Sequence, residues 1–481
     1  RLAARALHAL ARHLALVGFM GAGKSTLAPE VARRLGRPLV STDAIVEERT
    51  GTSVERIFAE RGEAAFRALE EEALLDALAR RPLAVLDLGG GAVLSERARA
   101  ALSEHAFAVL VEVSVEEAWQ RAAGAGRPLA RDAEAFRSLY VERQPVYEAV
   151  ADGRARDADG VVLAAAGVHV AEGASAALAA LVPGEGAVEL VADETVARLH
   201  GARAREALGE RLRAEHLVPA GERAKTATVA EQLWEALRLD RTGMLVALGG
   251  GATTDLAGFV AATFLRGVSW MPVPSTLVGQ VDAAIGGKTA IDLPTGKNLV
   301  GAFHWPARVV IDPDLLATLP GEERDNGLAE VVKTGLLAGE RLWELPLAEQ
   351  VRRCAAFKAA ICLRDPKDRG ERAQLNLGHT FAHALEAASG YALPHGRAVA
   401  LGLQAALRLS GLPELAAEVG ELLGTRPVRA DRGAAWEALR RDKKAVGGEV
   451  RLVLLAAPGQ PRVGVPVAEA EVRAALDALV D

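Results

Sequence analysis

The alternation of apolar and polar residues divides the chain into regions of different character. Between residues 14 and 160, short apolar runs typical of buried strands (LALVGF, PLVSTD, LAVLDLGGG, AVLVEV) alternate with longer amphipathic stretches such as residues 53–80. A second alternation follows, with the runs VELVAD, MLVALGGG, SWMPVPS and RVVIDP. Strands that alternate with helices build mostly parallel sheets. The pattern therefore predicts two successive α/β regions.

The pattern changes at two places. At residues 157–172 the runs VVLAA and VHVAEG predict two further strands. From Pro320 onward, Ala/Leu/Glu/Arg-rich stretches predict a largely helical region with one late strand at residues 449–455. We therefore expect three domains, residues 1–160, 161–319 and 320–481, and the amphipathic start RLAARALHALARH predicts a short leading helix.

Composition narrows the class of protein. A chain of 481 residues is too long for one core, and half of the residues are apolar while a quarter are charged, as in soluble globular proteins. The net charge of −6 argues against a nucleic-acid partner, and the apolar runs are too short to predict a membrane span. Cys354 and Cys362 lie eight residues apart in a predicted helix and do not form a disulfide framework. We expect a cytoplasmic protein.

The most specific motif is GFMGAGKS at residues 18–25, a complete phosphate-binding loop between a predicted strand (14–17) and a predicted helix (26–35). Its glycines let backbone N–H groups turn toward the phosphates of a nucleotide. Lys24 would reach the β- and γ-phosphates, and the Ser25 hydroxyl would bind Mg²⁺. The motif predicts a domain of the P-loop NTPase type, with an ATP-binding set that consists of Gly21, Ala22, Gly23, Lys24, Ser25 and Thr26.

Further residues in this region are weak signals alone but form a coherent acceptor site together. An aspartate can orient an alcohol, two arginines can clamp a carboxylate, and a glycine-rich turn lets a ring approach the backbone. An arginine on a lid can neutralise the transferred phosphoryl group. The residues are Asp43, Arg67, Gly89, Gly90, Gly91, Arg127 and Arg143.

On these motifs, residues 12–160 resemble shikimate kinase, which implies Mg²⁺- and ATP-dependent phosphorylation of the shikimate 3-hydroxyl. The resemblance implies that Asp43 binds the hydroxyls, that Arg67 and Arg143 bind the carboxylate, and that the three glycines contact the ring. Arg127 would belong to the lid, and Arg121 would stack on adenine.

Two departures from the family stand out. The family's usual final helix is expected to be missing after Asp159. The other departure concerns the metal. The family usually has an aspartate two residues before Asp43, where this chain has Ser41, which puts the Mg²⁺ affinity in doubt. An alternative is that this domain is a nucleotide-binding regulator or a structural appendage. The intact Lys24, Arg67 and Arg143 argue against that alternative.

A second set of residues is typical of a metal site. His379 and His383 lie one helical turn apart in NLGHTFAHALE, His395 follows in LPHGRAV, and Glu330 lies in GLAEVVK. The histidine pair alone is more often part of a helical core, but nitrogen and oxygen ligands from separate segments suit a catalytic Zn²⁺ ion. Gly249, Gly250 and Gly251, with Asp255 downstream, are a weak dinucleotide signal because they do not match G-x-G-x-x-G.

Basic residues gather at predicted loops of the same region. Any one of them is explained by a solvated surface, but Lys288 in a Gly-Gly-Lys turn is not. The residues are Arg266, Lys288, Lys297, Lys333, Lys358 and Arg372.

The motifs LVALGGGATTDLAGF, VDAAIGGKTAID, GKNLVGAF, GLAEVVKTG and LNLGHTFAHALE occur in the order found in 3-dehydroquinate synthase, which residues 161–481 resemble. The resemblance implies a Rossmann-like NAD-binding domain and a helical metal-binding domain. It also implies conversion of the keto-sugar acid phosphate DAHP to 3-dehydroquinate with release of phosphate. NAD⁺ would serve as a catalyst that is regenerated, and Zn²⁺ or Co²⁺ would bind the C4 and C5 hydroxyls.

The resemblance also implies a role for each matching residue. The metal ligands would be Glu330, His379 and His395, and His383 would transfer protons. The substrate and catalytic positions would be Arg266, Asp282, Lys288, Lys297, Asn298, Lys333, Lys358, Asp368, Arg372, Asn376 and the pair Lys443–Lys444. The NAD-binding surface would consist of Glu222, Lys225, Gly250, Gly251, Asp255, Ser275 and Thr276.

Two departures bear on these roles. Asp368 stands where the family has glutamate, and Arg397 stands where it usually has an acid two residues after the second metal histidine. If that acid supports the ligand, the metal affinity is in doubt. A glycerol-type metal-dependent dehydrogenase is the alternative, but Lys288, Lys297 and Lys333 suit a phosphorylated acid better than glycerol. We expect small-molecule substrates (shikimate, ATP and DAHP) and a homodimer formed through the synthase part.

Overall fold

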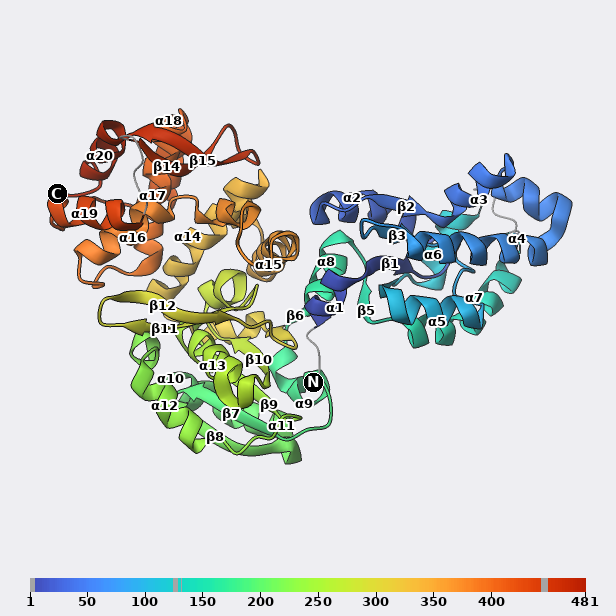
Figure 1. Ribbon diagram of the computed structural model, residues 1–481, viewed down its shortest axis with the longest axis horizontal. Helices are drawn as coiled ribbons and strands as arrows, with labels where there is room; N and C mark the ends of the chain where they lie inside the picture. Colours follow the sequence, from blue (N-terminus) through green and yellow to red (C-terminus); the bar gives the residue numbers. More distant parts are fainter. Residues whose placement is uncertain (1–4, 124–128, 131, 443–448) are drawn as a thin grey trace. The chain divides into compact units, whose positions relative to one another are not determined.

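The computed structural model describes residues 5–123, 129–130, 132–442 and 449–481 (Figure 1). The chain forms two compact units that meet in sequence between Val168 and His169. Among the described helices, none combines the length and the apolar character needed to cross a bilayer.

The first unit is built on a five-stranded sheet in the order β2-β3-β1-β4-β5, in which all neighbours are parallel. Helices connect the strands and cover the sheet, as the alternating pattern predicted (Figure 1). Its elements are α1 (Arg5–Ala11), β1 (His13–Val17), α2 (Lys24–Leu35), β2 (Leu39–Ser41), α3 (Thr42–Thr50), α4 (Val54–Ala79), β3 (Val85–Asp87), α5 (Glu96–His105), β4 (Ala106–Val111), α6 (Val115–Ala122), α7 (Ala133–Val150), β5 (Gly153–Ala155) and α8 (Ala158–Ala166).

Helix α8 corrects one prediction. The run VVLAA was expected to be a strand, and a closing helix was expected to be missing, but both statements are wrong. Asp157 caps the helix through a bond from the Gly160 N–H, and Gly167 ends it with a left-handed φ of 70°. The helix is buried on nearly all sides, so it lacks the polar face that marks an amphipathic helix.

The second unit begins with a four-stranded parallel sheet in the order β10-β9-β7-β8. Three of these strands were predicted, but β8 was not, because this strand at the edge of the sheet has a half-exposed, polar sequence, LRAEHLV. The elements of this part are β6 (Val168–Val170), α9 (Leu178–Leu181), β7 (Val188–Asp193), α10 (Glu194–Val196), α11 (Ala202–Leu208), β8 (Leu212–Val218), α12 (Ala227–Ala236), β9 (Met244–Gly249), α13 (Gly251–Thr263), β10 (Ser269–Pro274), β11 (Lys288–Leu293), β12 (Gly296–Phe303) and β13 (Val309–Ile311).

Strands β11 and β12 form an antiparallel hairpin that the sequence pattern did not predict. Lys288, expected in a turn, is the first residue of β11 and follows Gly286 and Gly287, whose φ values are 97° and 67°. The glycines are needed there because the chain turns with left-handed backbone conformations.

The remainder of the second unit is helical, as predicted from Pro320 onward. Helices α16, α17 and α19 pack together with the hairpin β14–β15, of which β14 was predicted and β15 was not (Figure 1). The elements are α14 (Gly321–Ala338), α15 (Leu347–Arg364), α16 (His379–Ala388), α17 (His395–Leu409), α18 (Pro413–Leu422), α19 (Arg432–Asp442), β14 (Glu449–Leu455), β15 (Pro461–Ala468) and α20 (Glu469–Asp477).

Candidate active sites

The phosphate loop joins β1 to α2 in the first unit. Gly18, Gly21 and Gly23 have φ values of 144°, 80° and 90°, which side chains other than glycine rarely adopt. A Cβ at Gly21 would also collide with the carbonyl oxygen of Ala118. The buried Lys24 Nζ donates to the carbonyl oxygens of Gly18 (2.7 Å) and Phe19 (3.1 Å). The loop is therefore a preformed cradle of backbone N–H groups at the start of a 12-residue helix.

The other predicted ATP-binding residues lie around this cradle. Ala22 is in the loop, Ser25 and Thr26 are in the first turn of α2, and the Thr26 N–H donates to the carbonyl oxygen of Gly23 (3.1 Å). Arg121, exposed at the end of α6, donates to the carbonyl oxygen of Gly21 (3.4 Å). Arg127 lies outside the described residues.

The predicted acceptor residues meet at the carboxyl edge of the sheet. Asp43 lies in the first turn of α3, and a Cβ at Gly89 would be 2.8 Å from its Oδ1 atom. The hydroxyl of Tyr147 donates to the carbonyl oxygen of Gly90 (2.5 Å), and burial raises the pKa of Tyr147 to about 12. Ser41, which stands in the place of the family's aspartate, caps α3 by accepting from the Ala44 N–H (3.4 Å).

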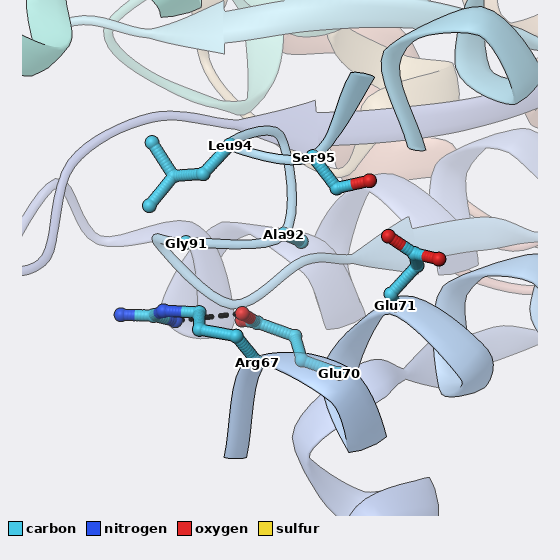
Figure 2. Close-up of a pocket in the computed structure, with 7 residues that line it drawn as sticks. All are labelled: Arg67, Glu70, Glu71, Gly91, Ala92, Leu94 and Ser95. Carbon is cyan, nitrogen blue, oxygen red and sulfur yellow. Dashed lines mark hydrogen bonds and ion pairs between the residues drawn. The ribbon is translucent and has the colours of Figure 1, made fainter. Parts of the chain in front are cut away.

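Arg67 and Gly91 line a cavity of about 260 Å³ beside this edge (Figure 2). The guanidinium lies so close to Gly91 that a Cβ there would overlap it. Arg67 Nη1 donates to Glu70 Oε2 (2.6 Å), and Arg143 is buried with its Nη2 atom 3.7 Å from Glu63 Oε1. Arg67 Nη2 also donates to Glu63 Oε1 (2.9 Å), so both predicted clamp arginines lie near one carboxylate, that of Glu63.

Sequence reasoning missed Glu70, which is 1% exposed and holds Arg67 in place. Burial raises its pKa, although the Arg67 charge acts in the opposite direction. A signal was present, because Glu70 follows Arg67 by three residues on α4 and therefore lies on the same helical face.

In the second unit, the predicted dinucleotide residues gather where β9 and β10 end. Gly250 precedes α13 and Gly251 is its first residue, while the Ser275 N–H donates to the carbonyl oxygen of Gly249 (2.9 Å). A Cβ at Gly250 would lie 3.0 Å from Thr276 Cγ2. The N–H groups in the first turn of a helix that begins with glycine are suited to a pyrophosphate.

A buried lysine completes this edge. Lys225 Nζ lies 2.9 Å from Asp255 Oδ2 and 3.6 Å from Glu222 Oε1. Burial disfavours the ammonium ion, but Asp255 and Glu222 outweigh it and raise the pKa of Lys225. Lys225 also donates to the side-chain oxygen of Asn298 in β12, so the hairpin is tied to this surface.

The three predicted metal ligands come together from three helices. Glu330 Oε1 in α14 lies 3.4 Å from His379 Nε2 in α16 and 3.3 Å from His395 Nε2 at the start of α17. One donor atom from each residue lies within 4.8 Å of the others. One carboxylate oxygen and two imidazole nitrogens are a donor set that suits Zn²⁺ or Co²⁺.

A carboxylate to which the sequence analysis assigned no role supports this cluster. Glu386 in α16 is 5% exposed, and its Oε1 lies 3.2 Å from His395 Nδ1. Arg397, which replaces the family's usual acid, is exposed on α17. His379 Nδ1 is 3.2 Å from the carbonyl oxygen of Leu377, so each histidine presents Nε2 to Glu330.

A chain of charged groups connects the cluster to the α/β part of the unit. Lys333, 1% exposed, forms ion pairs with Glu330 and with Asp282 (3.7 Å). Asp282 in η6 (Gly279–Ala283) also pairs with Lys358 of α15 at 2.9 Å. Burial favours the neutral acid, but Lys333 and Lys358 lower the pKa of Asp282 to about 2. Burial also lowers the pKa of Lys358.

Other predicted substrate residues surround these groups. Arg372 is buried and donates to the carbonyl oxygen of Gly286 (3.0 Å) beside Lys288, which pairs with Asp368. The ring of His383 lies 5.6 Å from that of His379. Asn376 ends η9 (Glu371–Asn376), three residues before the first residue of α16.

Two predicted residues lie on surfaces, and one pair lies outside the described structure. Lys297 Nζ is 5.1 Å from the ring centroid of Tyr391, which joins the hairpin to the segment before α17. Arg266 is exposed and precedes β10, on the edge of the sheet opposite Ser275. Lys443 and Lys444 lie outside the described residues.

Comparison with known families follows this division of the chain. A shikimate kinase model matches residues 20–166. Models of the 3-dehydroquinate synthase N-terminal and C-terminal domains match residues 215–326 and 327–444.

Curated relatives agree with the match to 3-dehydroquinate synthase. The 3-dehydroquinate synthase of Bordetella pertussis is 41% identical over 349 residues, which are 64% of this chain and 95% of the relative. That of Symbiobacterium thermophilum is 40% identical over 65% of this chain and 97% of its own length.

A solved 2-epi-5-epi-valiolone synthase from Streptomyces hygroscopicus, with NAD⁺ and Zn²⁺ bound, is 26% identical with a TM-score of 0.59, and the match covers 65% of this chain and 96% of the other. The chain therefore belongs to the 3-dehydroquinate synthase family and joins a shikimate kinase domain to it, which makes it a bifunctional enzyme of the shikimate pathway.

Proposed function

We propose that the charged chain from Asp282 to Glu330 and the histidine cluster form the site that converts DAHP to 3-dehydroquinate and phosphate. The observation that carries this assignment is the meeting of Glu330, His379 and His395 with the buried Lys333. The donor set fits Zn²⁺ or Co²⁺, and the solved 2-epi-5-epi-valiolone synthase binds NAD⁺ with Zn²⁺. When bound, NAD⁺ would accept and return a hydride, and the metal ion would polarise the substrate hydroxyls.

The protein's own residues bind the substrate and move its protons. Lys358, Lys288 and Arg372 offer positive charge to the substrate carboxylate and phosphate. Asp282 keeps Lys333 and Lys358 in place, because its carboxylate remains ionised at neutral pH. His383 lies beside the metal cluster on α16, in a position to transfer a proton as the hydroxyls react.

For the first unit we propose phosphorylation of the shikimate 3-hydroxyl by ATP. The cradle of N–H groups and Lys24 would bind the β- and γ-phosphates, and Ser25 would contribute to the Mg²⁺ shell. Asp43 would orient the attacking hydroxyl beside Gly89, and Arg67 with Arg143 would bind the carboxylate.

One pair of assays tests both assignments. Purified protein with DAHP and a trace of NAD⁺ should release phosphate over many turnovers without accumulation of NADH. In a separate reaction, shikimate and Mg²⁺-ATP should yield ADP and shikimate 3-phosphate. Stoichiometric NADH would instead favour the glycerol-type dehydrogenase, and binding of ATP without phosphorylation of shikimate would favour a regulatory first domain.

Three further proposals concern organisation. We place the kinase boundary near Gly167 and the boundary of the helical synthase domain near Pro320, where α14 begins. We propose a homodimer through the synthase part, supported by Leu299, Val300 and Phe303, which are exposed apolar residues of β12. A cytoplasmic location is supported by two free thiols, Cys354 and Cys362.

A further inference from the structure

The carboxylate of Glu63 occupies the edge of Arg67 that a bound carboxylate would use. Glu63 Oε1 accepts from Arg67 Nη2 (2.9 Å) and Nε (3.2 Å), the two parallel donors with which arginine binds an acid in bidentate fashion. The same oxygen lies 3.7 Å from Nη2 of Arg143. Glu63 therefore lies between the two arginines assigned to the shikimate carboxylate.

Glu63 is not needed to hold Arg67 in place. The remaining donor of the guanidinium, Nη1, is bound by the buried Glu70 at 2.6 Å. The guanidinium carbon also lies 5.6 Å from the ring centroid of Phe58 and 5.3 Å from that of Phe66. Figure 2 shows the Arg67–Glu70 pair at the cavity wall formed by Gly91. These contacts fix the arginine from the protein side, independently of Glu63.

Glu70 and Glu63 differ in solvent exposure, and this difference indicates different roles beside Arg67. The side chain of Glu70 is 1% exposed, whereas that of Glu63 is 45% exposed. Glu63 also follows a break in α4, where Gly62 has the non-helical angles φ 78° and ψ 171°. A half-exposed acid at such a break can be replaced by another anion at low cost, because water solvates the displaced carboxylate.

We propose that Glu63 is an internal competitor of the substrate carboxylate in the kinase site, a proposal that rests on the assignment of Arg67 and Arg143 to shikimate. On binding, the carboxylate of a polyol acid replaces that of Glu63 on the Nε–Nη2 edge of Arg67. One anion leaves the arginine pair as another arrives, so the net charge of the pair and its ligand is unchanged. The affinity for shikimate is therefore lower than it would be if no carboxylate of the protein occupied Arg67 and Arg143.

The test is the dissociation constant of shikimate for the full chain and its Glu63→Gln variant, measured by calorimetry without nucleotide. Steady-state kinetics with Mg²⁺-ATP complete the comparison. The variant should bind shikimate about threefold to fivefold more tightly, as expected for the loss of one half-exposed ion pair, and KM should fall more than kcat changes. Glu60→Gln is the matched control, because Glu60 lies on the same helix and pairs with Arg56 (2.6 Å). Its dissociation constant should equal that of the wild type.

Each outcome decides between two ideas. Unchanged or weaker shikimate binding by Glu63→Gln would overturn the competitor role, and weaker binding would mean that Glu63 positions Arg67. Failure of the kinase assignment looks different, because the wild-type protein would then neither bind nor phosphorylate shikimate. A Glu63→Ala variant should repeat the result of the glutamine variant, which excludes an effect peculiar to the amide.

Discussion

Replacement of Glu386 by glutamine should weaken metal binding by Glu330, His379 and His395 about tenfold to hundredfold, or roughly 1.4 to 2.7 kcal/mol. The magnitude follows from the geometry of one contact. Glu386 Oε1 lies 3.2 Å from His395 Nδ1, and the acid is only 5% exposed, so water cannot readily take its place. A glutamine still accepts the hydrogen bond but lacks the negative charge that makes the imidazole a stronger donor to the metal.

The measurement is competition for Zn²⁺ between the full chain and a chromophoric chelator, with Co²⁺ absorption as a second readout. The control is Arg397→Glu, which restores the acid that the family usually has at that position. Because Arg397 is exposed and His395 already pairs with Glu386, the control should change the Zn²⁺ affinity by less than about twofold. Wild-type affinity in Glu386→Gln, or a tenfold gain in Arg397→Glu, would refute this reasoning.

Three other changes test the remaining parts of the molecule. Lys24→Ala should abolish ATP-dependent phosphorylation of shikimate, because it removes the charge that reaches the phosphates, and the same sample should still release phosphate from DAHP. Gly250→Val should raise the Kd for NAD⁺ at least about tenfold by filling the space beside Thr276, while Zn²⁺ affinity stays unchanged; equal NAD⁺ affinity would remove Gly250 from the dinucleotide surface. Asp282 has a pKa of about 2, below its ordinary value, so its contribution of about 2 kcal/mol is present above about pH 4 and is lost as the pH falls toward 2. The difference in the free energy of urea unfolding between wild type and Asp282→Asn should therefore shrink over that range, and a constant difference would contradict the shifted pKa.

The sequence predicted the elements whose residue pattern can arise from only one kind of structure. The strands β1, β7 and β9 are buried on both faces, so their apolar runs stand out from their surroundings. The phosphate loop is predictable because each of its glycines adopts a conformation that other residues avoid. The prediction was wrong for helix α8 because this helix is apolar on nearly every side. Strand β8 was not predicted because a strand at the edge of a sheet can have a polar sequence.

Within the sites, the motifs predicted the groups assigned to substrate, metal and cofactor but not the carboxylates that hold or compete with them. Glu70 and Glu63 lie in ordinary helical sequence, where acids are usually solvated. Glu386 is the last residue of the motif LNLGHTFAHALE, but no role was assigned to it. Their roles depend on packing: Glu386 meets a histidine of the next helix, and Glu63 meets Arg143 of α7. Contacts between helices cannot be read from the spacing within one helix.

Helical spacing nevertheless contains part of the missing signal. Glu70 follows Arg67 by three residues, and Glu386 follows His383 by three residues, so each acid lies on the face of a residue already assigned to a site. The helical face that carries a site residue points toward a cavity or a neighbouring helix. An acid three residues after the site residue lies on the same face and is therefore buried beside a positive or metal-ligating group. Both acids are in fact at most 5% exposed, while Glu60, which lies seven residues before Arg67, is exposed and pairs with Arg56 on its own helix. Burial, and not the presence of an acid at helical spacing, is therefore what separates a supporting carboxylate from a solvated one.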